Sequence, residues 1–262
     1  MLVTEAFLSP LNRRLEESQA TPLDILRLAH RIFAPRLGIL TSMQRSGTFL
    51  CRLAEREGLG LDVVFVDTGV LHQETRWTRD ELARTHPCLR VVTLIPKRTF
   101  AAQTLEEGLL YQTREGQERC CELRKTEPLL AEKGRWDVLI SALRKDEGGS
   151  RGNVRPLSLD VEMGALRVHP LANVTREELS AMIEAEPGVV INPLHAMGFP
   201  TIGCFPCTTP VLPDEPERAG RWRHLLTVQY CGINPVDRGV EPRGVEMKES
   251  RAEALRQAVM EE

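Results

Sequence analysis

The sequence predicts an α/β fold, built on a mostly parallel, twisted sheet with helices on both faces. Short apolar runs alternate with helical stretches over residues 21–143, and this alternation is typical of parallel strands joined by crossover helices. The runs are short and apolar, as in strands buried on both faces. A chain of 262 residues with 42% hydrophobic side chains is also long enough for one large core.

The first strong element is a helix that begins at Thr21. Thr21 suits the cap position, Pro22 suits the first turn, and Asp24 follows as an early acid. The apolar side chains after it recur at helical spacing and form one face over two turns: Ile25, Leu28, Ala29, Ile32 and Phe33. Residues 1–20 are polar and mixed, so we expect a partly ordered lead-in there.

Strands and helices are expected to alternate after this first helix. The helical stretches lie at residues 48–56 and 74–85. The apolar runs predict four strands, at residues 37–41, 62–66, 90–95 and 136–143. We expect residues 21–234 to form a single domain.

Beyond residue 150 the alternation loosens. A short strand is expected to end at residues 167–171, and an amphipathic helix to run over residues 175–184, with Thr175 as its cap. Residues 187–216 are rich in Pro and Gly and therefore predict loops. The charged tail, residues 235–262, is expected to end in a surface helix.

Charge and composition narrow the class of protein. The net charge of −3 gives no reason to expect a nucleic acid partner. No apolar run approaches the roughly 20 residues of a membrane helix, and the first residues lack the apolar core of a secretory signal. We therefore expect a cytoplasmic protein with no membrane attachment, whose seven cysteines are thiols or ligands rather than a disulfide frame. A homo-oligomer is compatible with the sequence.

Two polar loops follow the first two predicted strands, at residues 42–47 and 67–69. Ligands of open α/β sheets bind beyond the carboxyl ends of the strands, so both loops are candidate binding loops. The first also opens a helix, whose backbone N–H groups suit an anion such as phosphate. Ordinary connecting loops are the alternative, since neither G-x-x-x-x-G-K-[ST] nor G-x-G-x-x-G is present.

Four cysteines fall into two pairs, Cys120-Cys121 and Cys204-x-x-Cys207. Adjacent cysteines are poor disulfide partners, and on a helix their side chains diverge by roughly 100°, which suits one small metal ion badly. A 4Fe–4S cluster takes four thiolates on separate irons. The residues therefore favour a cluster, with zinc or with buried or redox thiols as alternatives.

A series of motifs in order along the chain resembles the assimilatory adenylyl-sulfate (APS) reductases of the PAPS reductase family. The likeness runs over about residues 21–234. It rests on D-T-G-x-L-x-x-E-T at residues 67–75, C-C-x-x-R-K-x-x-P-L at 120–129, L-R-K-D at 143–146, S-R at 150–151, H-P-L-A at 169–172, N-P-L-H at 192–195, G-F-P-T-I-G-C-F-P-C-T at 198–208 and R-A-G-R-W at 218–222.

The resemblance implies an adenine-nucleotide alpha-hydrolase-like fold with Rossmann-type layering. It implies reductive cleavage of adenylyl sulfate in sulfate assimilation, in which an enzyme cysteine attacks the sulfur, AMP leaves and an S-sulfocysteine forms. A thioredoxin-type thiol donor then releases sulfite. The family's 4Fe–4S cluster would be held by Cys120, Cys121, Cys204 and Cys207, and it shapes and polarises the site rather than supplying electrons.

The resemblance also assigns roles to single residues. Cys231 would be the nucleophile, because a thiolate is the reactive form and nearby positive charge favours it. The same positive charge would hold the sulfate and phosphate groups of the substrate. The substrate-binding residues would be Ser42, Asp67, Thr68, Gly69, Lys125, Arg144, Arg151, Arg218 and Arg221. On a helix, Lys125 shares a face with Cys121, four residues before it.

The chain departs from the family pattern at two places. The nucleotide loop, usually S-x-G-x-E, reads S-M-Q-R-S at residues 42–46, and the catalytic end, usually E-C-G-L-H, reads Y-C-G-I-N at residues 230–234. Three other functions therefore stay open: a reductase that uses PAPS, an adenylating enzyme of the wider nucleotide-loop family, and a cluster-binding homologue without activity.

Overall fold

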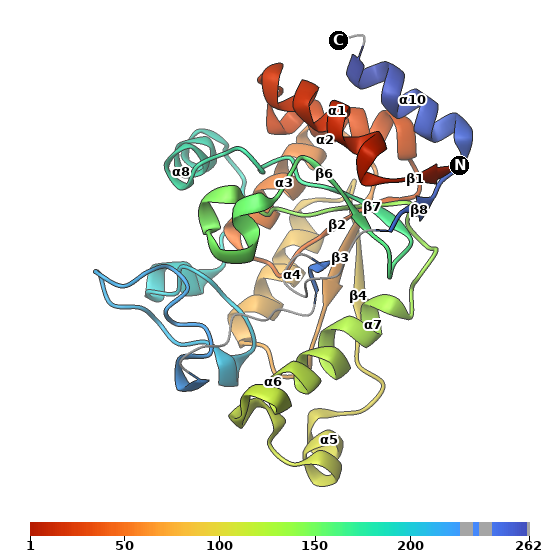
Figure 1. The fold of residues 1–262 in the computed structure, drawn as a ribbon. Coiled ribbons are helices and arrows are strands. Elements are labelled where there is room, and N and C mark those ends of the chain that lie inside the picture. The colour runs from red at the N-terminus through yellow and green to blue at the C-terminus, as the bar shows by residue number, and fades with distance from the viewer. Residues whose placement is uncertain (226–232, 236–242, 261–262) are drawn as a thin grey trace.

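A six-stranded sheet is the frame of the molecule (Figure 1), and its strands lie in the order β4-β3-β2-β5-β7-β6. The computed structural model describes residues 1–225, 233–235 and 243–260. All neighbouring strands run parallel except β6, which is antiparallel to β7, so the predicted mostly parallel sheet is confirmed. The strands are β2 (Leu37–Leu40), β3 (Asp62–Val66), β4 (Arg90–Leu94), β5 (Val138–Ile140), β6 (Leu157–Asp160) and β7 (Ala165–Val168).

Successive strand residues point to opposite faces of this sheet. In β2, Leu37 and Ile39 belong to the larger apolar core, and Leu40 belongs to a smaller one on the other face. Gly38 also faces the smaller core, where a Cβ atom would lie 2.9 Å from Val64 Cγ2 and 3.3 Å from Trp136 Nε1. The close approach of Val64 and Trp136 therefore favours glycine at this position.

The larger core fills the first face of the sheet. Helices from both ends of the chain contribute to it. Helix α10 packs against α1 and α2, and the three helices lie side by side in Figure 1. The helices that contribute to this core are α1 (Glu5–Glu17), α2 (Pro22–Phe33), α3 (Arg45–Arg56), α4 (Gln73–Thr85), α8 (Arg176–Ala185) and α10 (Glu249–Met260).

The second face carries the smaller core and one long helical rod. The rod consists of α6 (Arg114–Cys121), a π-helical stretch (Glu122–Thr126) and α7 (Glu127–Leu130), and it crosses the front of Figure 1. Leu129 and Leu130 pack it against this face. The Cys120-Cys121 pair ends α6, a helix that was not predicted from the sequence.

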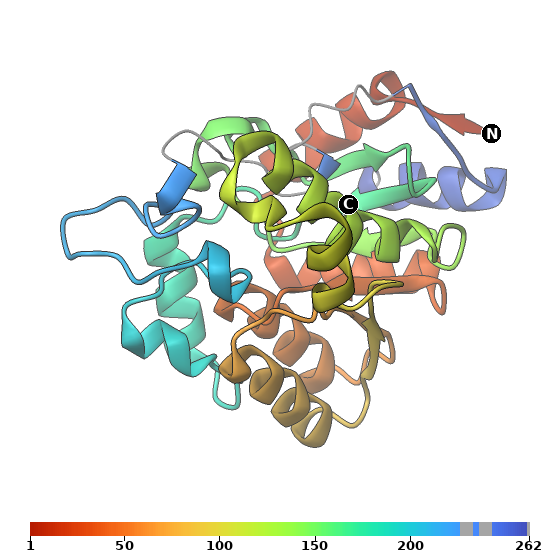
Figure 2. The ribbon, with the colours of Figure 1, turned by 90° about the horizontal axis from the view of Figure 1, so that it is seen from below.

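The remaining elements are short and lie around the sheet. Residues 187–225 extend to one side of it as loops and single turns (Figure 1, Figure 2). The elements are α5 (Phe100–Glu107) and 3₁₀ turns at Leu110–Gln112, Lys145–Glu147, Gly149–Asn153, Pro193–Met197, Phe205–Cys207 and Arg223–Leu225.

The two predicted helix caps are confirmed. Thr21 and Asp24 form a reciprocal capping box at the start of α2, and Thr175 and Glu178 form another at the start of α8. Each box satisfies two backbone N–H groups that would otherwise lack partners at a helix end.

The structure differs from the expectations at the two ends of the chain. Residues 5–17 form α1 rather than a loosely ordered lead-in, because Leu8, Leu11 and Leu15 supply a buried stripe within a polar composition. The expected tail helix is present as α10, yet it is not only a surface helix, since Ala252, Leu255 and Val259 enter the larger core. Strand β1 (Leu2–Val3) pairs with β8 (Val245–Glu246) and joins the two ends.

Strand β6 was not predicted from the sequence. Its four residues alternate apolar and polar side chains over too short a run to stand out. Among the described residues, no helix has the length and apolar character needed to cross a membrane.

Candidate active site

A cavity of about 150 Å³ lies beyond the carboxyl ends of the central strands. Thr41 and Ser42 follow β2, Thr68 follows β3, and Ser141 to Leu143 follow β5 at its wall. This is where an open α/β sheet binds its ligands. Residues from the loop segment 195–221 close the other side of the cavity.

Seven of the nine predicted substrate-binding residues line this cavity. They come from six separate stretches of the chain, so the fold brings together residues that the sequence spreads over 180 positions. They are Ser42, Thr68, Lys125, Arg144, Arg151, Arg218 and Arg221. Their contact with a substrate stays a prediction.

Asp67 and Gly69 do not line the cavity. Asp67 accepts hydrogen bonds from the Gly69 backbone N–H at 2.9 Å and from Arg76 Nε at 3.1 Å. Gly69 has a φ of 78°, a left-handed conformation that glycine adopts without steric cost. Both residues therefore shape the loop that presents Thr68.

The charge on the cavity wall is strongly positive. Among the described residues, its cationic side chains are Lys125, Arg45, Arg144, Arg151, Arg218 and Arg221, and its carboxylates are Glu147 and Glu217. Part of this charge is already paired, since Arg144 Nε lies 2.8 Å from Asp146 and Arg151 pairs with Glu147. The excess of cations suits a ligand with more than one anionic group.

Arg221 is the most constrained of these cations. Its guanidinium lies 4.4 Å from the centre of the Trp222 ring, and Nη1 donates to the Ile202 carbonyl at 3.4 Å. Its buried Nε has no hydrogen-bond partner among the described residues. Arg218 lies 5.9 Å from the same ring, so Trp222 holds both arginines of the R-A-G-R-W motif toward the cavity.

The loop after β2 reaches the cavity as predicted, and it opens α3. Met43 takes a left-handed φ of 59°, and its N–H donates to Thr41 Oγ1 at 3.0 Å. Gln44 fixes the loop on both sides, because its Nε2 donates to Ser42 Oγ at 2.9 Å and its Oε1 accepts the Ile202 N–H at 2.9 Å. Gln44 thus ties the loop to the opposite wall.

The side chain of His195 lies against the start of α3, and both of its ring nitrogens form hydrogen bonds. Its Nδ1 donates to the Phe199 carbonyl at 2.8 Å, and its Nε2 accepts the Arg45 backbone N–H at 3.2 Å. Burial, with Arg45 as a second cause, lowers the pKa of His195 to about 4. The residue is therefore a neutral structural histidine, and it satisfies one N–H at the helix start that an anion would otherwise use.

The four paired cysteines line one smaller cavity of about 20 Å³. Cys120 and Cys121 reach it from the end of α6, and Cys204 and Cys207 reach it from the 3₁₀ turn at Phe205–Cys207. Cys204 and Lys125 line both cavities. The cysteine site and the cationic site are therefore neighbours that share a lysine.

Three polar side chains point at the sulfur atoms. Gln103 Nε2 lies 3.5 Å from Cys120 Sγ, Gln117 Nε2 lies 3.0 Å from Cys121 Sγ, and Thr68 Oγ1 lies 3.3 Å from Cys204 Sγ. The two amides donate to sulfur, and such bonds stabilise a sulfur atom that carries negative charge. The surroundings of these cysteines thus differ from an ordinary apolar core.

Burial favours the protonated form of two of these thiols, Cys207 and Cys120. It raises the pKa of Cys207 to about 12, with Cys204 as a second cause, and it also raises the pKa of Cys120. Lys125 opposes the shift at both thiols. In the part of the chain that the structure describes, no group of three or more His, Cys, Asp or Glu is placed to hold a single metal ion.

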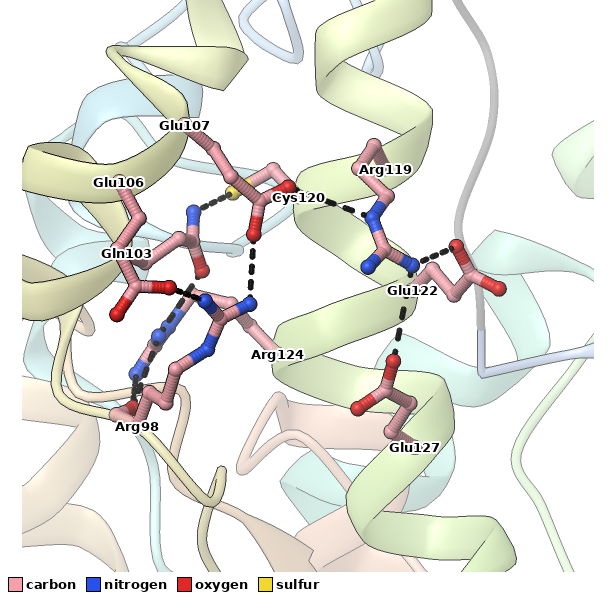
Figure 3. A network of polar contacts seen from close by, with 9 residues as sticks. All are labelled: Arg98, Gln103, Glu106, Glu107, Arg119, Cys120, Glu122, Arg124 and Glu127. Atoms are coloured by element: carbon pink, nitrogen blue, oxygen red, sulfur yellow. Dashed lines mark hydrogen bonds and ion pairs between the residues drawn. The ribbon is translucent and has the colours of Figure 1, made fainter.

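Arg124 connects the cysteine site to the loop after β3. Its Nε donates to the Thr68 carbonyl, and its Nη1 lies 3.1 Å from Gln103 Oε1. Figure 3 shows Gln103 between Arg124 and Cys120. Because Arg124 occupies the amide oxygen, the amide nitrogen of Gln103 is left to face the sulfur. Sequence reasoning did not single out Arg124, Gln103 or Gln117, although Arg124 stands inside the tandem-cysteine motif.

Cys231, the predicted nucleophile, lies outside the described residues. Ile233 and Asn234, which follow it closely in the sequence, line the cationic cavity. Its assignment stays a prediction.

The chain matches the model of the phosphoadenosine phosphosulfate reductase domain over residues 36–210. It belongs to the PAPS reductase family. This PAPS reductase family member is 36% identical to the adenosine 5'-phosphosulfate reductase of Streptomyces coelicolor, over 85% of this chain and 91% of the relative. It is 31% identical to the adenosine 5'-phosphosulfate reductase 1 of Bacillus subtilis, over 81% of this chain and 90% of that protein. The resemblance stated from the motifs is therefore confirmed.

Solved structures support the fold of the PAPS reductase family member. The PAPS reductase of Candida auris superposes with a TM-score of 0.64 at 22% identity, over 77% of this chain and 96% of that one. The FMN adenylyltransferase of Candida glabrata superposes with a TM-score of 0.50 at 15% identity, over 78% and 65%. These similarities confirm the predicted α/β fold.

Proposed function

We propose that this protein is an oxidoreductase that cleaves adenylyl sulfate to sulfite and AMP with electrons from thiols, as a step of sulfate assimilation. One observation carries the proposal beyond the family match: Lys125 and Cys204 line both the cationic cavity and the cysteine cavity. An anionic ligand in the first cavity would therefore lie directly beside the cysteine site.

The reaction has two steps that balance. In the first, the Cys231 thiolate attacks the sulfur of the sulfate group, an S–S bond forms, the S–O bond to the phosphate breaks, and AMP leaves with the bonding electrons. In the second, a thiolate of a thioredoxin-type donor attacks Cys231 Sγ and sulfite leaves. The mixed disulfide is then resolved by the donor's second thiol, which regenerates Cys231 and oxidises the donor.

The cations of the cavity wall have two tasks in this scheme. Arg144 and Arg151 would bind the phosphate and sulfate oxygens, because guanidinium groups bind such anions through two parallel hydrogen bonds. Lys125, Arg218 and Arg221 would also stabilise the attacking thiolate and the charge that develops on the leaving AMP. Ser42 and Thr68 would add neutral hydrogen bonds.

The cysteine site fits a 4Fe–4S cluster better than a single metal ion. Four thiols line one cavity, three of their sulfur atoms have a polar side chain within 3.5 Å, and the described residues hold no single-ion site. Cys120, Cys121, Cys204 and Cys207 would be its ligands. When bound, the cluster would supply a polarisable centre beside Lys125, while the electrons of the reaction come from thiols.

The test is a sulfite assay on anaerobically purified full-length protein, with APS and PAPS side by side and a thioredoxin-type donor. We expect sulfite from APS at a higher rate than from PAPS. Higher turnover of PAPS would reassign the substrate. Conversion of ATP to pyrophosphate without sulfite release would point to an adenylating enzyme instead.

The nucleophile is tested without any donor. Incubation with APS should add one sulfonate, about 80 Da, to Cys231 and release one AMP. Cys231→Ser should abolish both, whereas Cys88→Ser, an exposed thiol away from both cavities, should change neither. An adduct on another cysteine of Cys231→Ser would contradict the assignment.

The cluster is tested by metal content. Anaerobic protein should carry about four irons per chain and absorb broadly near 400 nm, roughly the region typical of iron–sulfur thiolate sites. Cys204→Ser should lose the iron. Stoichiometric zinc without iron would contradict the cluster.

A further inference from the structure

A buried ion pair lies in the sheet outside both cavities. Arg167 of β7 and Asp160 of β6 are each 1% exposed. Arg167 Nε and Nη2 lie 2.9 and 2.6 Å from Asp160 Oδ2. Replacing a buried ion pair by apolar side chains is often neutral or stabilising, so such a pair is weak evidence for a role in stability.

The side chains of this ion pair lie on the second face of the sheet. Leu166 and Val168, the neighbours of Arg167 in β7, belong to the larger core on the first face. Because side chains alternate along a strand, Arg167 lies on the face of the smaller core. Ile233 packs against that smaller core.

Arg167 also binds the chain near its C-terminal end. Its Nη2 donates to the Ile233 carbonyl at 3.1 Å. Its Nη1 is buried and has no hydrogen-bond partner among the described residues. Asp160 therefore fixes one edge of the guanidinium, and Nη2 of that edge also binds the backbone carbonyl of Ile233, which follows the predicted nucleophile.

This contact joins the sheet to the cationic cavity. Ile233 and Asn234 line the cavity together with Lys125 and Arg144, whereas Arg167 lines neither cavity. Cys231 precedes Ile233 by two residues. A displacement of the Ile233 backbone would therefore move the chain next to the proposed nucleophile, while all seven predicted substrate-binding residues of the cavity wall would be retained.

We propose that Arg167, held by Asp160, is a positioning residue that anchors the backbone at Ile233, two residues after the proposed nucleophile Cys231. The inference rests on the proposed function of Cys231. Orientation within about 1 Å decides the rate of a group transfer, and a loss of that order costs roughly 100-fold. Arg167 thus acts on the rate of sulfonation rather than on the affinity for the nucleotide.

The test compares two variants of the full-length, cluster-loaded protein. The double variant Arg167→Met with Asp160→Leu removes the pair and leaves no unpaired buried charge. The single variant Arg167→Lys keeps a cation beside Asp160 but loses the guanidinium group that binds both Asp160 and the Ile233 carbonyl. It replaces the double variant in the test if the double variant does not fold. Arg90→Met, which removes an Arg–Asp pair of the same sheet between β4 and β3, is the matched control.

Three measurements are made on each protein. We expect the single-turnover rate of Cys231 sulfonation at saturating APS to fall about 10–100-fold, while the Kd for AMP stays within about twofold of the wild-type value. Hydrogen exchange at the Ile233 and Asn234 amides should become faster by about tenfold. Arg90→Met should leave all three unchanged.

Two outcomes would overturn the proposal. A wild-type sulfonation rate with unchanged exchange would show that Arg167 anchors nothing. Equal losses in AMP affinity and sulfonation rate would show a general structural role. If the wild-type protein forms no adduct, the proposed function fails instead, and the exchange measurement alone then decides whether Arg167 holds the Ile233 backbone.

Discussion

The two faces of the sheet have different tasks. The first face is covered by α1, α2, α3, α4, α8 and α10 over one large apolar core. The second face has a smaller apolar core and also carries the buried Arg167–Asp160 pair. The cavities lie at the strand ends, where the loops and the α6–α7 rod meet. Stability and chemistry are therefore separable, and variants on the two sides should affect different measurements.

The largest expected effect is on stability, from the first face. Leu26 is 1% exposed in α2 and belongs to the larger core. Leu26→Ala should lower the free energy of unfolding by about 2–5 kcal/mol, because it removes buried methyl groups and leaves a cavity. Chemical denaturation measures the loss. A loss below about 1 kcal/mol would contradict the view that the first face determines stability. A change in the APS affinity of the folded protein would contradict the view that this face has no part in the chemistry.

The next effect is on ligand affinity, from the cavity wall. Arg144→Ala should weaken APS binding about 10–100-fold, since a hydrogen bond to a charged group is worth about 1.5–3 kcal/mol. The affinity is best measured in a Cys231→Ser background, where APS is not consumed. Arg155→Ala, which removes an ion pair with Glu16 outside the cavity, is the matched control. Equal losses in the two variants would indicate general electrostatics rather than a binding site.

A third effect is the pH dependence of stability. The pKa of His195 is about 4 in the folded protein, against about 6.5 in an unfolded chain. Between these values the unfolded state binds more protons, so the contribution of His195 is complete above about pH 6.5 and is lost as the pH falls toward 4. His195→Asn keeps a donor for Phe199 and should remove about 1–2 kcal/mol of this dependence, after a discount for partial exposure.

Unfolding curves of wild type and His195→Asn between pH 4 and 7 measure this difference. His72 and His86 also have lowered pKa values because of burial, and they contribute equally to both proteins. If the free energy of unfolding depended on pH in the same way in both proteins, His195 would have an ordinary pKa in the folded state.

The smallest effect comes from a helix cap on the first face. Thr21→Ala removes the capping box of α2 and should cost about 1 kcal/mol. Thr4 is the matched control, because it caps α1 without a side-chain hydrogen bond. Thr4→Ala should therefore cost less, and equal costs would show that the box at Thr21 adds nothing.

The fold was largely predictable where apolar side chains form continuous runs. Strands β2, β3 and β4 lie within one residue of the predicted positions, and the caps of α2 and α8 were identified by residue. Strand β6 and helix α6 were missed because neither has a long apolar pattern: α6 is mostly charged and polar, with Gln117 and Cys121 as its buried residues. Tertiary packing, which the local sequence does not encode, fixes these elements.

The site was predictable as a set of residue types but not as an arrangement. The motifs named the cations and the cysteines, yet Lys125 joins the two cavities only because the end of α6 meets the loop around Cys204. Arg124 looked like one more cation of the motif, and the fold buries it as a connector between Thr68 and Gln103. Roles of this kind depend on contacts between segments that lie far apart in the chain.

The pairing of β1 with β8 has a consequence for the order of events during synthesis. Leu2 and Val3 find their strand partners at Glu246 and Val245, which a ribosome makes long after them. At about 5–20 residues per second, the first strand waits roughly 10–50 s for its partner. During that time Leu8, Leu11 and Leu15 of α1 have no α10 to pack against. The apolar stripe of α1 therefore lacks part of its native cover until α10 has been made.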